Sequence, residues 1–520
     1  MNWLKKINIR ELVALAVLAV AVSAAYSNTL NSSFHLDDER AIAKNPPVFM
    51  REITWDNLTH AAFDSEIRTR PVAHITFALN YYFHHLNLPG YHIVNIAIHI
   101  LAAFFLFYLL KATLALPPLA GKFGQHAVVI SFITAAIWAL HPLQTQSVTY
   151  IVQRMNSMCA MFYILALLFY VKGRVAQGNK TKWAFFAGCT LSGILALGSK
   201  ENGATLPFFI FLYEWYFLQD LRIKHASNKR QWYLLAAAVL LLGFLAVLYY
   251  GANPVNKILA PYNKIGFTVF QRLLTEARVV ILYITLLFFP VPGRLNLDYD
   301  FTLSSSLFSP VTTFVSVAAL FCLLLFALLS AKKQRLFSFC ILWFLGNLVI
   351  ESSVIPLELV FEHRTYLPST FFLLLFVILL YRLLSARRLL LYVFFVIILL
   401  ILPYWTYERN RVWADELTLW QDCLEKSPNK WRVHNNLGKE YFRIWETDKA
   451  IHHYRMALSI APNAILPRMN LASALAQQSR YQEAIIELQI ILTYEPDNAR
   501  ALKHLQTNRQ LLRQQMIKKR

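Results

Sequence analysis

The sequence predicts an all-α protein in two parts, a polytopic membrane domain over residues 1–405 and a small helical-repeat domain over 406–520. Hydrophobic residues make up 57% of the chain and charged residues only 15%, whereas soluble proteins carry roughly 25% charged residues. Long apolar runs alternate with short polar segments from Leu12 to Pro403, and the chain becomes charged after Trp405. Small residues and prolines then recur at a fixed period near the C-terminus.

The membrane domain is predicted from segments that are long and apolar enough to span a bilayer, which takes about 20 residues. The first of them is interpreted as an uncleaved anchor, because a polytopic chain needs no removable signal. Eleven spans are expected, approximately at 11–27, 91–110, 127–145, 153–171, 183–199, 204–219, 232–250, 310–330, 336–353, 366–382 and 388–405.

A further apolar segment, 272–290, contains Arg272, Glu276 and Arg278. Lysine and arginine are concentrated in the short loops between the other runs, which is typical of cytoplasmic loops. All of these loops can be cytoplasmic only if residues 251–308 remain on the far side of the membrane. We therefore expect 272–290 to be a re-entrant or interfacial element, or a pair of half-spans, and the repeat domain to lie opposite the cytoplasm.

The C-terminal part has an internal period of 34 residues, typical of the tetratricopeptide repeat, in which small residues occur where helices cross and proline occurs at the turn. We predict two full repeats, near 431–464 and 465–498. A helix through Trp420 and a closing helix over about 498–515 are expected to complete the stack. The residues that share the period are Pro428, Pro462 and Pro496, Gly438 and Ala472, and Ala450 and Ala484.

Composition also excludes some classes of function. The net charge of +21 comes with no basic run beside a nucleic-acid-binding motif, so no nucleic-acid partner is expected. Four of the five cysteines lie in apolar runs and no CxxC spacing occurs, which supports neither a zinc site nor a disulfide framework. Asp37, Asp38 and Asp298 could offer oxygen ligands, but no spacing rule supports a metal, and we expect neither metal nor cofactor.

The most distinctive chemical feature is Asp37-Asp38-Glu39, in the large polar loop 28–90 on the far side of the first span. Adjacent like charges raise at least one pKa, which suits a carboxylate that must accept a proton. A solvated acidic turn has the same sequence, so both interpretations stay open at this point.

Other ionisable residues are expected on the same side. Each alone could anchor a helix at the interface, but residues of this type near membrane depth are costly and together indicate a site. The candidates are Arg70, His141, Arg154, Lys200, Glu201, Asp298, Glu362, His363 and Arg364.

This combination suits sugar transfer from a lipid-linked phosphate. The departing phosphate needs cations, and the acceptor hydroxyl needs a base, for which Asp37 or Asp38 is available. A single displacement would invert the anomeric centre, as in inverting glycosidases. The cations available for the phosphate are Arg154, Lys200, His363 and Arg364.

The sequence resembles the transmembrane and tetratricopeptide-repeat-containing O-mannosyltransferases, within the GT-C glycosyltransferases. The resemblance covers nearly the whole chain in the same order and extends through Trp420 to Gly438. The matching stretches are Phe34-His35-Leu36-Asp37-Asp38, Arg70-Pro71-Val72, Gly90-Tyr91-His92-Ile93-Val94-Asn95, His141-Pro142, Gln153-Arg154, Ser199-Lys200-Glu201, Asp298-Tyr299, and Glu362-His363-Arg364-Thr365-Tyr366-Leu367-Pro368-Ser369.

The resemblance implies a GT-C fold, a polyprenyl-phosphate donor of one mannose, a catalytic carboxylate at Asp37 or Asp38, and repeats that engage a protein with a Ser or Thr acceptor. The enzyme would be a multi-pass protein surrounded by membrane lipids, with its site and repeats on the extracytoplasmic side. Eukaryotic members usually carry longer repeat arrays, so the short array suggests a bacterial relative in the plasma membrane. A eukaryotic member would lie in the endoplasmic reticulum with a lumenal C-terminus.

Two other functions fit the sequence. One is an oligosaccharide ligase that uses a polyprenyl-diphosphate donor, for which more cations or a metal would be favoured. The other is a membrane scaffold without enzymatic activity that presents the repeats to a partner. The scaffold leaves the acidic pair and the far-side arginine and histidine residues without a role.

Overall fold

The computed structural model describes residues 8–221, 254–262 and 266–518. The described residues form helices and no strand, which confirms the predicted all-α class. The chain divides into two compact units. The first contains the residues up to Leu295 together with Thr302–Arg411, and the second contains Asn296–Phe301 and the residues from Val412 onward.

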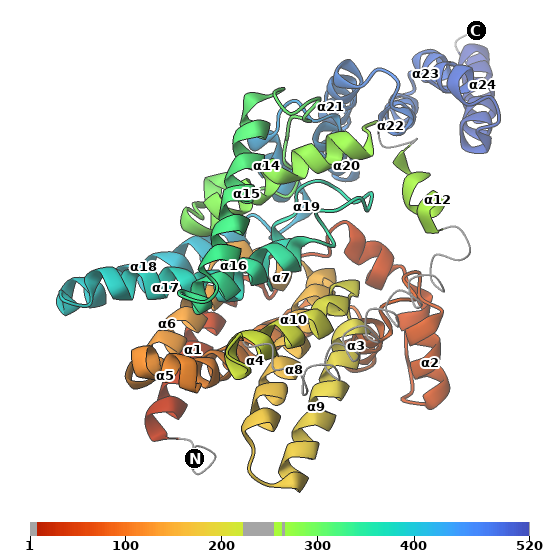
Figure 1. Cartoon of the computed structure of the whole chain (residues 1–520). Helices are drawn as coiled ribbons and strands as arrows, with labels where there is room; N and C mark the ends of the chain where they lie inside the picture. Colours follow the sequence, from red (N-terminus) through yellow and green to blue (C-terminus); the bar gives the residue numbers. More distant parts are fainter. Residues whose placement is uncertain (1–7, 222–253, 263–265, 519–520) are drawn as a thin grey trace. The chain divides into compact units, whose positions relative to one another are not determined.

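The first part of the first unit combines long apolar helices with an irregular segment. Between α6 and α8 the chain forms only short turns of helix, including α7 (Thr145–Val148). Helices α8 and α9 lie side by side as a hairpin (Figure 1). The helices here are α1 (Ile9–Ala25), α2 (Trp55–Phe63), α3 (Pro71–His84), α4 (Leu88–Leu114), α5 (Pro117–Phe123), α6 (Ala127–Ala139), α8 (Arg154–Val175), α9 (Asn179–Leu197) and α10 (Leu206–Tyr213).

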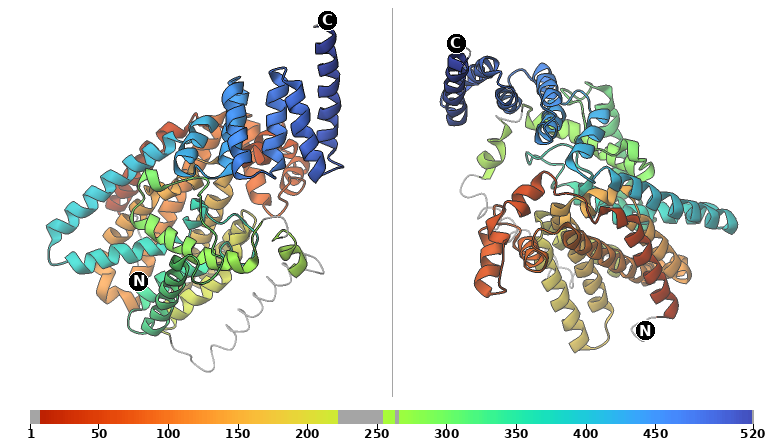
Figure 2. Two further views of the ribbon diagram at one scale, coloured as in Figure 1. Left: turned by 90° about the horizontal axis from the view of Figure 1, so that it is seen from above. Right: turned by 180° about the vertical axis from the view of Figure 1, so that it is seen from behind.

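The second part of the same unit is built from hairpins of apolar helices. Figure 2 shows α17 and α18 running out as one such hairpin. The helices are α12 (Pro254–Leu259), α14 (Val269–Phe288), α15 (Val311–Ser330), α16 (Arg335–Leu348), α17 (Ser369–Leu384) and α18 (Arg388–Arg411).

Five helical stretches in the described part of the chain are long and apolar enough to cross a membrane, and α16 and α17 are apolar but shorter. Helix α4 has 27 residues, about 40 Å at 1.5 Å per residue, and so exceeds a hydrocarbon core of about 30 Å. The predicted span 232–250 lies outside the described residues. The five stretches are Leu88–Leu114, Pro117–Ala139, Ile151–Val175, Val311–Ser330 and Arg388–Arg411.

The ambiguous segment 272–290 forms one continuous helix, α14, rather than two half-spans. Thr268 begins it with a capping box, in which its hydroxyl accepts from the Gln271 amide while the Gln271 side chain accepts from the Thr268 amide. Arg272 and Glu276, one turn apart, are both buried and form an ion pair of 2.8 Å. Two of the three charges that made this segment ambiguous therefore face the interior of the unit, whereas Arg278 is half-buried and donates to the Thr302 carbonyl at 2.6 Å.

The second unit stacks two helix pairs of equal length, α20 with α21 and α22 with α23. Gly438 allows the first pair to approach, because a Cβ added there would lie 2.7 Å from the ring of Tyr454. Helices α19 and α24 pack at the two ends of the stack. The bounds are α19 (Glu416–Lys426), α20 (Trp431–Arg443), α21 (Thr447–Ile460), α22 (Ile465–Gln477), α23 (Tyr481–Tyr494) and α24 (Ala499–Lys518).

The segment Asn296–Phe301 belongs to the second unit although it precedes α15 in the chain. The buried Asp298 carboxylate binds Lys430 Nζ at 2.5 Å and Arg432 Nε at 2.7 Å. Burial opposes its ionisation, but these two cations hold the pKa of Asp298 below its usual value. Ser427 Oγ accepts from the Asn296 side chain at 2.9 Å. The repeat unit is thus completed by six residues that come from the middle of the chain.

Candidate active site

The acidic pair lies in a tight turn after α1. Leu36 has φ +41°, a left-handed conformation that non-glycine residues rarely adopt. The Asp38 carboxylate closes the turn, since Oδ2 accepts from the His35 amide at 2.9 Å and Oδ1 accepts from the Val152 amide at 2.6 Å. Burial raises the pKa of Asp38 to about 7, although both of these hydrogen bonds act in the opposite direction. Asp38 is therefore enclosed and holds the first loop against the segment before α8.

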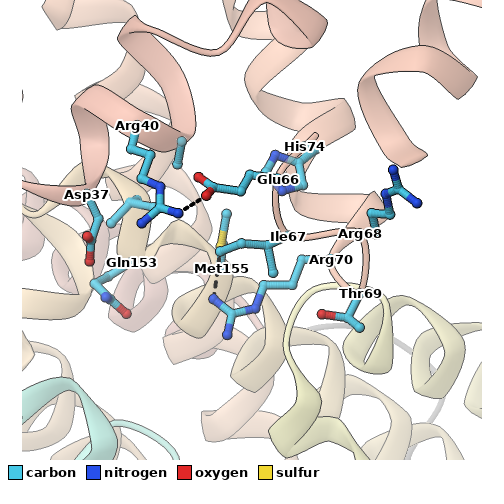
Figure 3. Close-up of a pocket in the computed structure, with 12 residues that line it drawn as sticks. Asp37, Arg40, Glu66, Ile67, Arg68, Thr69, Arg70, His74, Gln153 and Met155 are labelled. Carbon is cyan, nitrogen blue, oxygen red and sulfur yellow. Dashed lines mark hydrogen bonds and ion pairs between the residues drawn. The ribbon is translucent and has the colours of Figure 1, made fainter. Parts of the chain in front are cut away.

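Asp37 has the opposite environment. Its amide donates to Tyr150 Oη at 3.0 Å, and its side chain is exposed at the edge of a cavity of about 520 Å³ (Figure 3). The structure thus separates two neighbouring carboxylates by environment, one buried and one open. The cavity is lined by Asp37, Arg40, Ala41, Glu66, Ile67, Arg68, Thr69, Arg70, His74, Val152, Gln153 and Met155.

Three arginines line this cavity. Arg40 forms an ion pair with Glu66, and both side chains are exposed. Arg70 pairs with Glu201 through Nη2 at 2.9 Å. Arg68 is exposed and forms no ion pair with any residue that the structure describes. Among the three arginines, Arg68 is therefore the one whose charge is not neutralised by a carboxylate of the described part of the chain.

Glu201 orients the wall opposite Asp37. Besides pairing with Arg70, it accepts a hydrogen bond from Thr69 Oγ1 at 2.6 Å. Burial opposes ionisation, but the Arg70 charge and these hydrogen bonds lower the pKa of Glu201 to about 2. A carboxylate that stays ionised at neutral pH therefore fixes the segment Thr69–Arg70, at the N-terminus of α3, in place.

His74 lies one helical turn after Arg70 on α3 and faces the cavity (Figure 3). It is 1% exposed. Burial first, and then the charge of Arg70, lower the pKa of His74 to about 4. His74 is consequently neutral at physiological pH and adds a polar surface to the cavity without adding charge.

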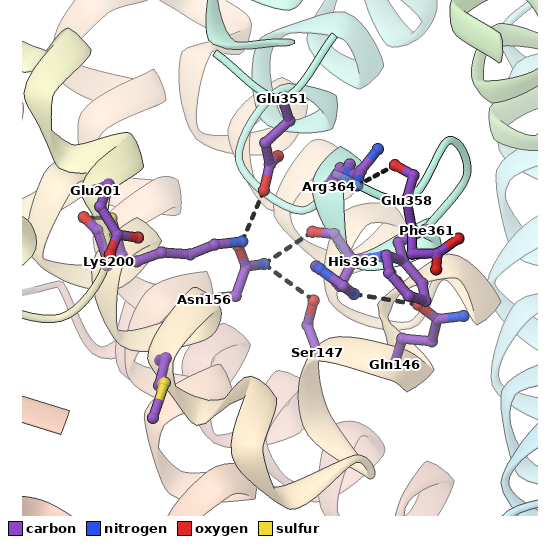
Figure 4. A network of polar contacts seen from close by, with 12 residues as sticks. Gln146, Ser147, Asn156, Lys200, Glu201, Glu351, Glu358, Phe361, His363 and Arg364 are labelled. Carbon is purple, nitrogen blue, oxygen red and sulfur yellow. Dashed lines mark hydrogen bonds and ion pairs between the residues drawn. The ribbon is translucent and has the colours of Figure 1, made fainter. Parts of the chain in front are cut away.

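A second polar network surrounds Asn156 (Figure 4). Lys200 Nζ binds Glu351 Oε1 at 2.8 Å and Asn156 Oδ1 at 2.9 Å. Asn156 Nδ2 in turn donates to the His363 carbonyl at 2.8 Å. Met155 and Glu201 both contact Arg70 of the cavity wall. Their neighbours in the sequence, Asn156 and Lys200, belong to the network, so the chain connects the cavity to the network at two places.

The charged groups of this network shift the pKa values of their neighbours. Burial opposes ionisation of Glu351, but Lys200 and Arg364 hold the pKa of that carboxyl below its usual value. Burial, together with Lys200 and Arg364, lowers the pKa of His363 well below its usual range. The Arg364 guanidinium donates to the carbonyls of Leu359 and Glu358 at 2.9 and 2.6 Å.

Several predicted site residues lie elsewhere. Arg154 is fully buried and donates to Asn95 Oδ1 at 2.6 Å and to the carbonyls of Tyr91 and Thr76. His141 is buried with Nε2 at 3.1 Å from the Leu287 carbonyl.

Two of the predicted acids are not among the residues that line the cavity. Glu362 is buried at the start of the short helix that contains His363 and Arg364. Asp298 belongs to the second unit, with Lys430 and Arg432. Of the predicted residues, the structure therefore places Asp37 and Arg70 on the cavity wall, and Lys200, His363 and Arg364 in the adjoining network.

Sequence reasoning missed several residues at these two places. His74 could have been found from its spacing of four from Arg70 after Pro71, which predicts a shared helix face. Glu351 lies at the end of an apolar run. A carboxylate at that depth in a membrane is a candidate functional residue by the same argument that indicated the other ionisable residues. Glu66 gives no local signal, because it reaches the cavity only through the folding of the first loop.

Comparisons with known proteins give one consistent result. A protein O-mannosyl-transferase of Caenorhabditis elegans is 27% identical over 88% of this chain and 63% of its own length. The protein O-mannosyl-transferase Tmtc3 of Drosophila melanogaster is 24% identical over 91% of this chain and 58% of its own. The mouse protein O-mannosyl-transferase TMTC3 is 24% identical over 92% of this chain and 54% of its own. No family model and no solved structure matches.

These relatives confirm the resemblance seen in the sequence. They are animal proteins, and they do not support the bacterial origin that the short repeat array suggested. The chain spans less than two thirds of the length of each of these three relatives.

Proposed function

We propose that this chain is a glycosyltransferase that moves a single mannose from a polyprenyl phosphate to a Ser or Thr hydroxyl of a protein. The observation that carries the proposal is the open Asp37 carboxylate, which faces arginine side chains across a cavity of about 520 Å³. The relatives support the proposal, because three proteins that align with about nine tenths of this chain are named protein O-mannosyl-transferases.

Asp37 is the base in this proposal, and Asp38 positions it. A base must reach the proton that it takes, so geometry decides before pKa. Asp38 has a pKa near neutrality, but it is fully buried and both of its oxygens accept backbone amides. Asp37 can meet a substrate hydroxyl, because its side chain is open to the cavity.

The reaction is a single displacement. The acceptor oxygen attacks the anomeric carbon while Asp37 takes its proton, and the bond from that carbon to the phosphate oxygen breaks with its electron pair going to the phosphate. The new glycosidic bond has inverted configuration. The polyprenyl phosphate departs with added negative charge, which a nearby cation stabilises.

Arg68 is our first candidate for that cation, because it lines the cavity and has no carboxylate partner among the described residues. Arg70 adds a second guanidinium held in position by Glu201. Lys200 and the His363 carbonyl both bind Asn156, the residue after Met155 of the cavity wall, and Arg364 follows His363 in the chain. The phosphate-binding roles predicted for these three residues and for Arg154 remain predictions.

The cavity is assigned to the non-cytoplasmic side of a multi-pass membrane protein. Basic residues gather at the opposite ends of the helices that begin near the cavity, for example Lys172 and Arg174 at the end of α8. Such residues favour the cytoplasmic side. The repeat unit would then recruit the acceptor protein on the side where transfer occurs.

The test is transfer by the purified full-length chain from polyprenyl-phosphate-mannose to a Ser- and Thr-containing acceptor, with the product mass as the readout. We expect an increase of one hexose per modified site. Transfer of several sugars together from a polyprenyl diphosphate would instead identify an oligosaccharide ligase. A protein that transfers from neither donor, yet loses its cellular role when 415–520 is deleted, would be a scaffold.

A further inference from the structure

A second cavity, of about 260 Å³, has five cations and one acid in its lining and has no part in the proposed transfer. It lies among α5, the turn between α15 and α16, and the end of α17, all within the first unit. Its charged lining residues are Lys122, Lys332, Lys333, Arg335, Arg382 and Asp220. We refer to it as the basic cavity.

The basic cavity lies at the far ends of helices that begin near the candidate active site. Near the start of helix α4, the Tyr91 carbonyl accepts a hydrogen bond from Arg154, which directly follows the cavity residues Val152 and Gln153 in the chain. The other end of α4 leads into α5, which lines the basic cavity. Helix α17 starts with Ser369, which accepts a hydrogen bond from Gln144, and reaches the basic cavity at Arg382. Because α4 alone is about 40 Å long, the two cavities lie at opposite ends of a helix that is long enough to cross a bilayer.

Two of its arginines are held in place before any ligand arrives. The Arg382 guanidinium lies 4.6 Å from the ring centroid of Phe337 and donates to Gln334 Oε1 at 3.1 Å. Arg335 donates to the Tyr216 carbonyl and pairs with Asp220 at 2.5 Å. Fixed cations lose little side-chain entropy when they bind a ligand.

The charge of this cavity is largely uncompensated. Lys122, Lys332, Lys333 and Arg382 are exposed and form no ion pair with a residue in the described ranges. The positive-inside rule explains why lysine and arginine occur in these loops. It does not require that residues from α5, from the turn between α15 and α16, and from the end of α17 converge on one concave site, and this convergence points to a bound anion.

A membrane lipid is the source of the anion that fits the surroundings. Leu383, next to Arg382, is 76% exposed, and Leu389 and Leu390 on the following helix are exposed too. Acyl chains can cover such residues while the headgroup enters the cavity, and basic pockets between membrane helices on the cytoplasmic side bind anionic headgroups. We infer that the basic cavity binds the phosphate headgroup of an anionic phospholipid of the cytoplasmic leaflet.

The experiment is a native mass spectrometry titration of the detergent-solubilised full-length protein with phosphatidic acid, phosphatidylcholine and inorganic phosphate. We expect one tightly bound phosphatidic acid, weak binding of phosphatidylcholine, and no competition by inorganic phosphate at comparable concentration. The double variant Lys332→Gln/Lys333→Gln should bind phosphatidic acid about 30-fold more weakly, because each surface cation contributes about fivefold. Lys332→Arg/Lys333→Arg should restore binding, which shows that the chain is folded.

The matched control is Lys180→Gln/Lys182→Gln. These lysines lie at the start of α9, joined by a short loop to the basic end of α8, and do not line the basic cavity. We expect this control to bind as the wild type does. An equal loss in both double variants would overturn the proposal in favour of general surface charge, and binding of inorganic phosphate as tight as that of the lipid would overturn the lipid assignment.

Discussion

At the scale of single residues, burial separates the roles of neighbouring acids and bases. Asp37 and Asp38 share a turn, but one is open and the other accepts two backbone amides. The doublet and its location in a large polar loop were predictable from the sequence. The assignment within the doublet was not, because it depends on Val152, which is 114 residues away along the chain, and on the left-handed conformation of Leu36.

His74 supplies a prediction for the dependence of stability on pH. Its pKa falls from 6.5 to about 4 in the folded protein, so between these values the unfolded chain binds more protons than the folded one. Stability therefore rises with pH over this window and reaches its full value above 6.5. Replacement by phenylalanine, which has no titrating group, should flatten the rise in thermal unfolding temperature across this window. An unchanged slope in the His74→Phe variant would assign the effect to another group.

At the scale of elements, the length of the apolar runs predicted the membrane helices, and the 34-residue period predicted the helix pairs of the repeats. The long runs became helices because a 20-residue apolar stretch satisfies its backbone only as a helix in lipid. The predicted span 127–145 was too long at its C-terminal end, because α6 ends at Ala139. No local signal there predicted the turns that bring Val152 and Gln153 to the cavity.

The helix crossing at Gly438 gives a prediction for the repeat unit. A Cβ at this position would lie 2.7 Å from Tyr454, and overpacking of this kind costs roughly 1–3 kcal/mol. Gly438→Ala should therefore lower the free energy of unfolding by about that amount. The double variant Gly438→Ala/Tyr454→Leu, which removes the ring, should show a favourable coupling between the two sites in a double-mutant cycle. Additive effects would mean that the ring does not limit this crossing.

At the scale of the whole molecule, residues distant in sequence complete both units. Asp298 binds Lys430 and Arg432, more than 130 residues away in the chain, and Arg70 binds Glu201. The sequence indicated Asp298, Arg70 and Glu201 as candidates, but a single sequence contains no information about which residues they meet. The order of the elements along the chain was predictable, and the pairing of these residues was not.

The orientation of the first unit can be tested by labelling. Cysteines introduced at Arg68 and at Lys333 should react with a membrane-impermeant maleimide from opposite sides of sealed vesicles. The background is Cys322→Ser, because Cys322 is exposed and the other four cysteines are buried. Reaction of both positions from one side would place the two cavities in the same compartment and contradict the orientation proposed here.

The most direct test of the central claim is the single-turnover rate of mannose transfer, measured with donor affinity, for Asp37→Asn, Asp38→Asn and Glu39→Gln. Asp37→Asn should bind the donor as the wild type does and transfer about 10²- to 10⁴-fold more slowly, as expected for loss of a general base. Asp38→Asn should lower the unfolding temperature, since its amide cannot accept both backbone hydrogen bonds. Glu39→Gln, at an acid paired with Lys44 away from the cavity, should transfer normally. An Asp37→Asn protein that transfers mannose at the wild-type rate would contradict the account.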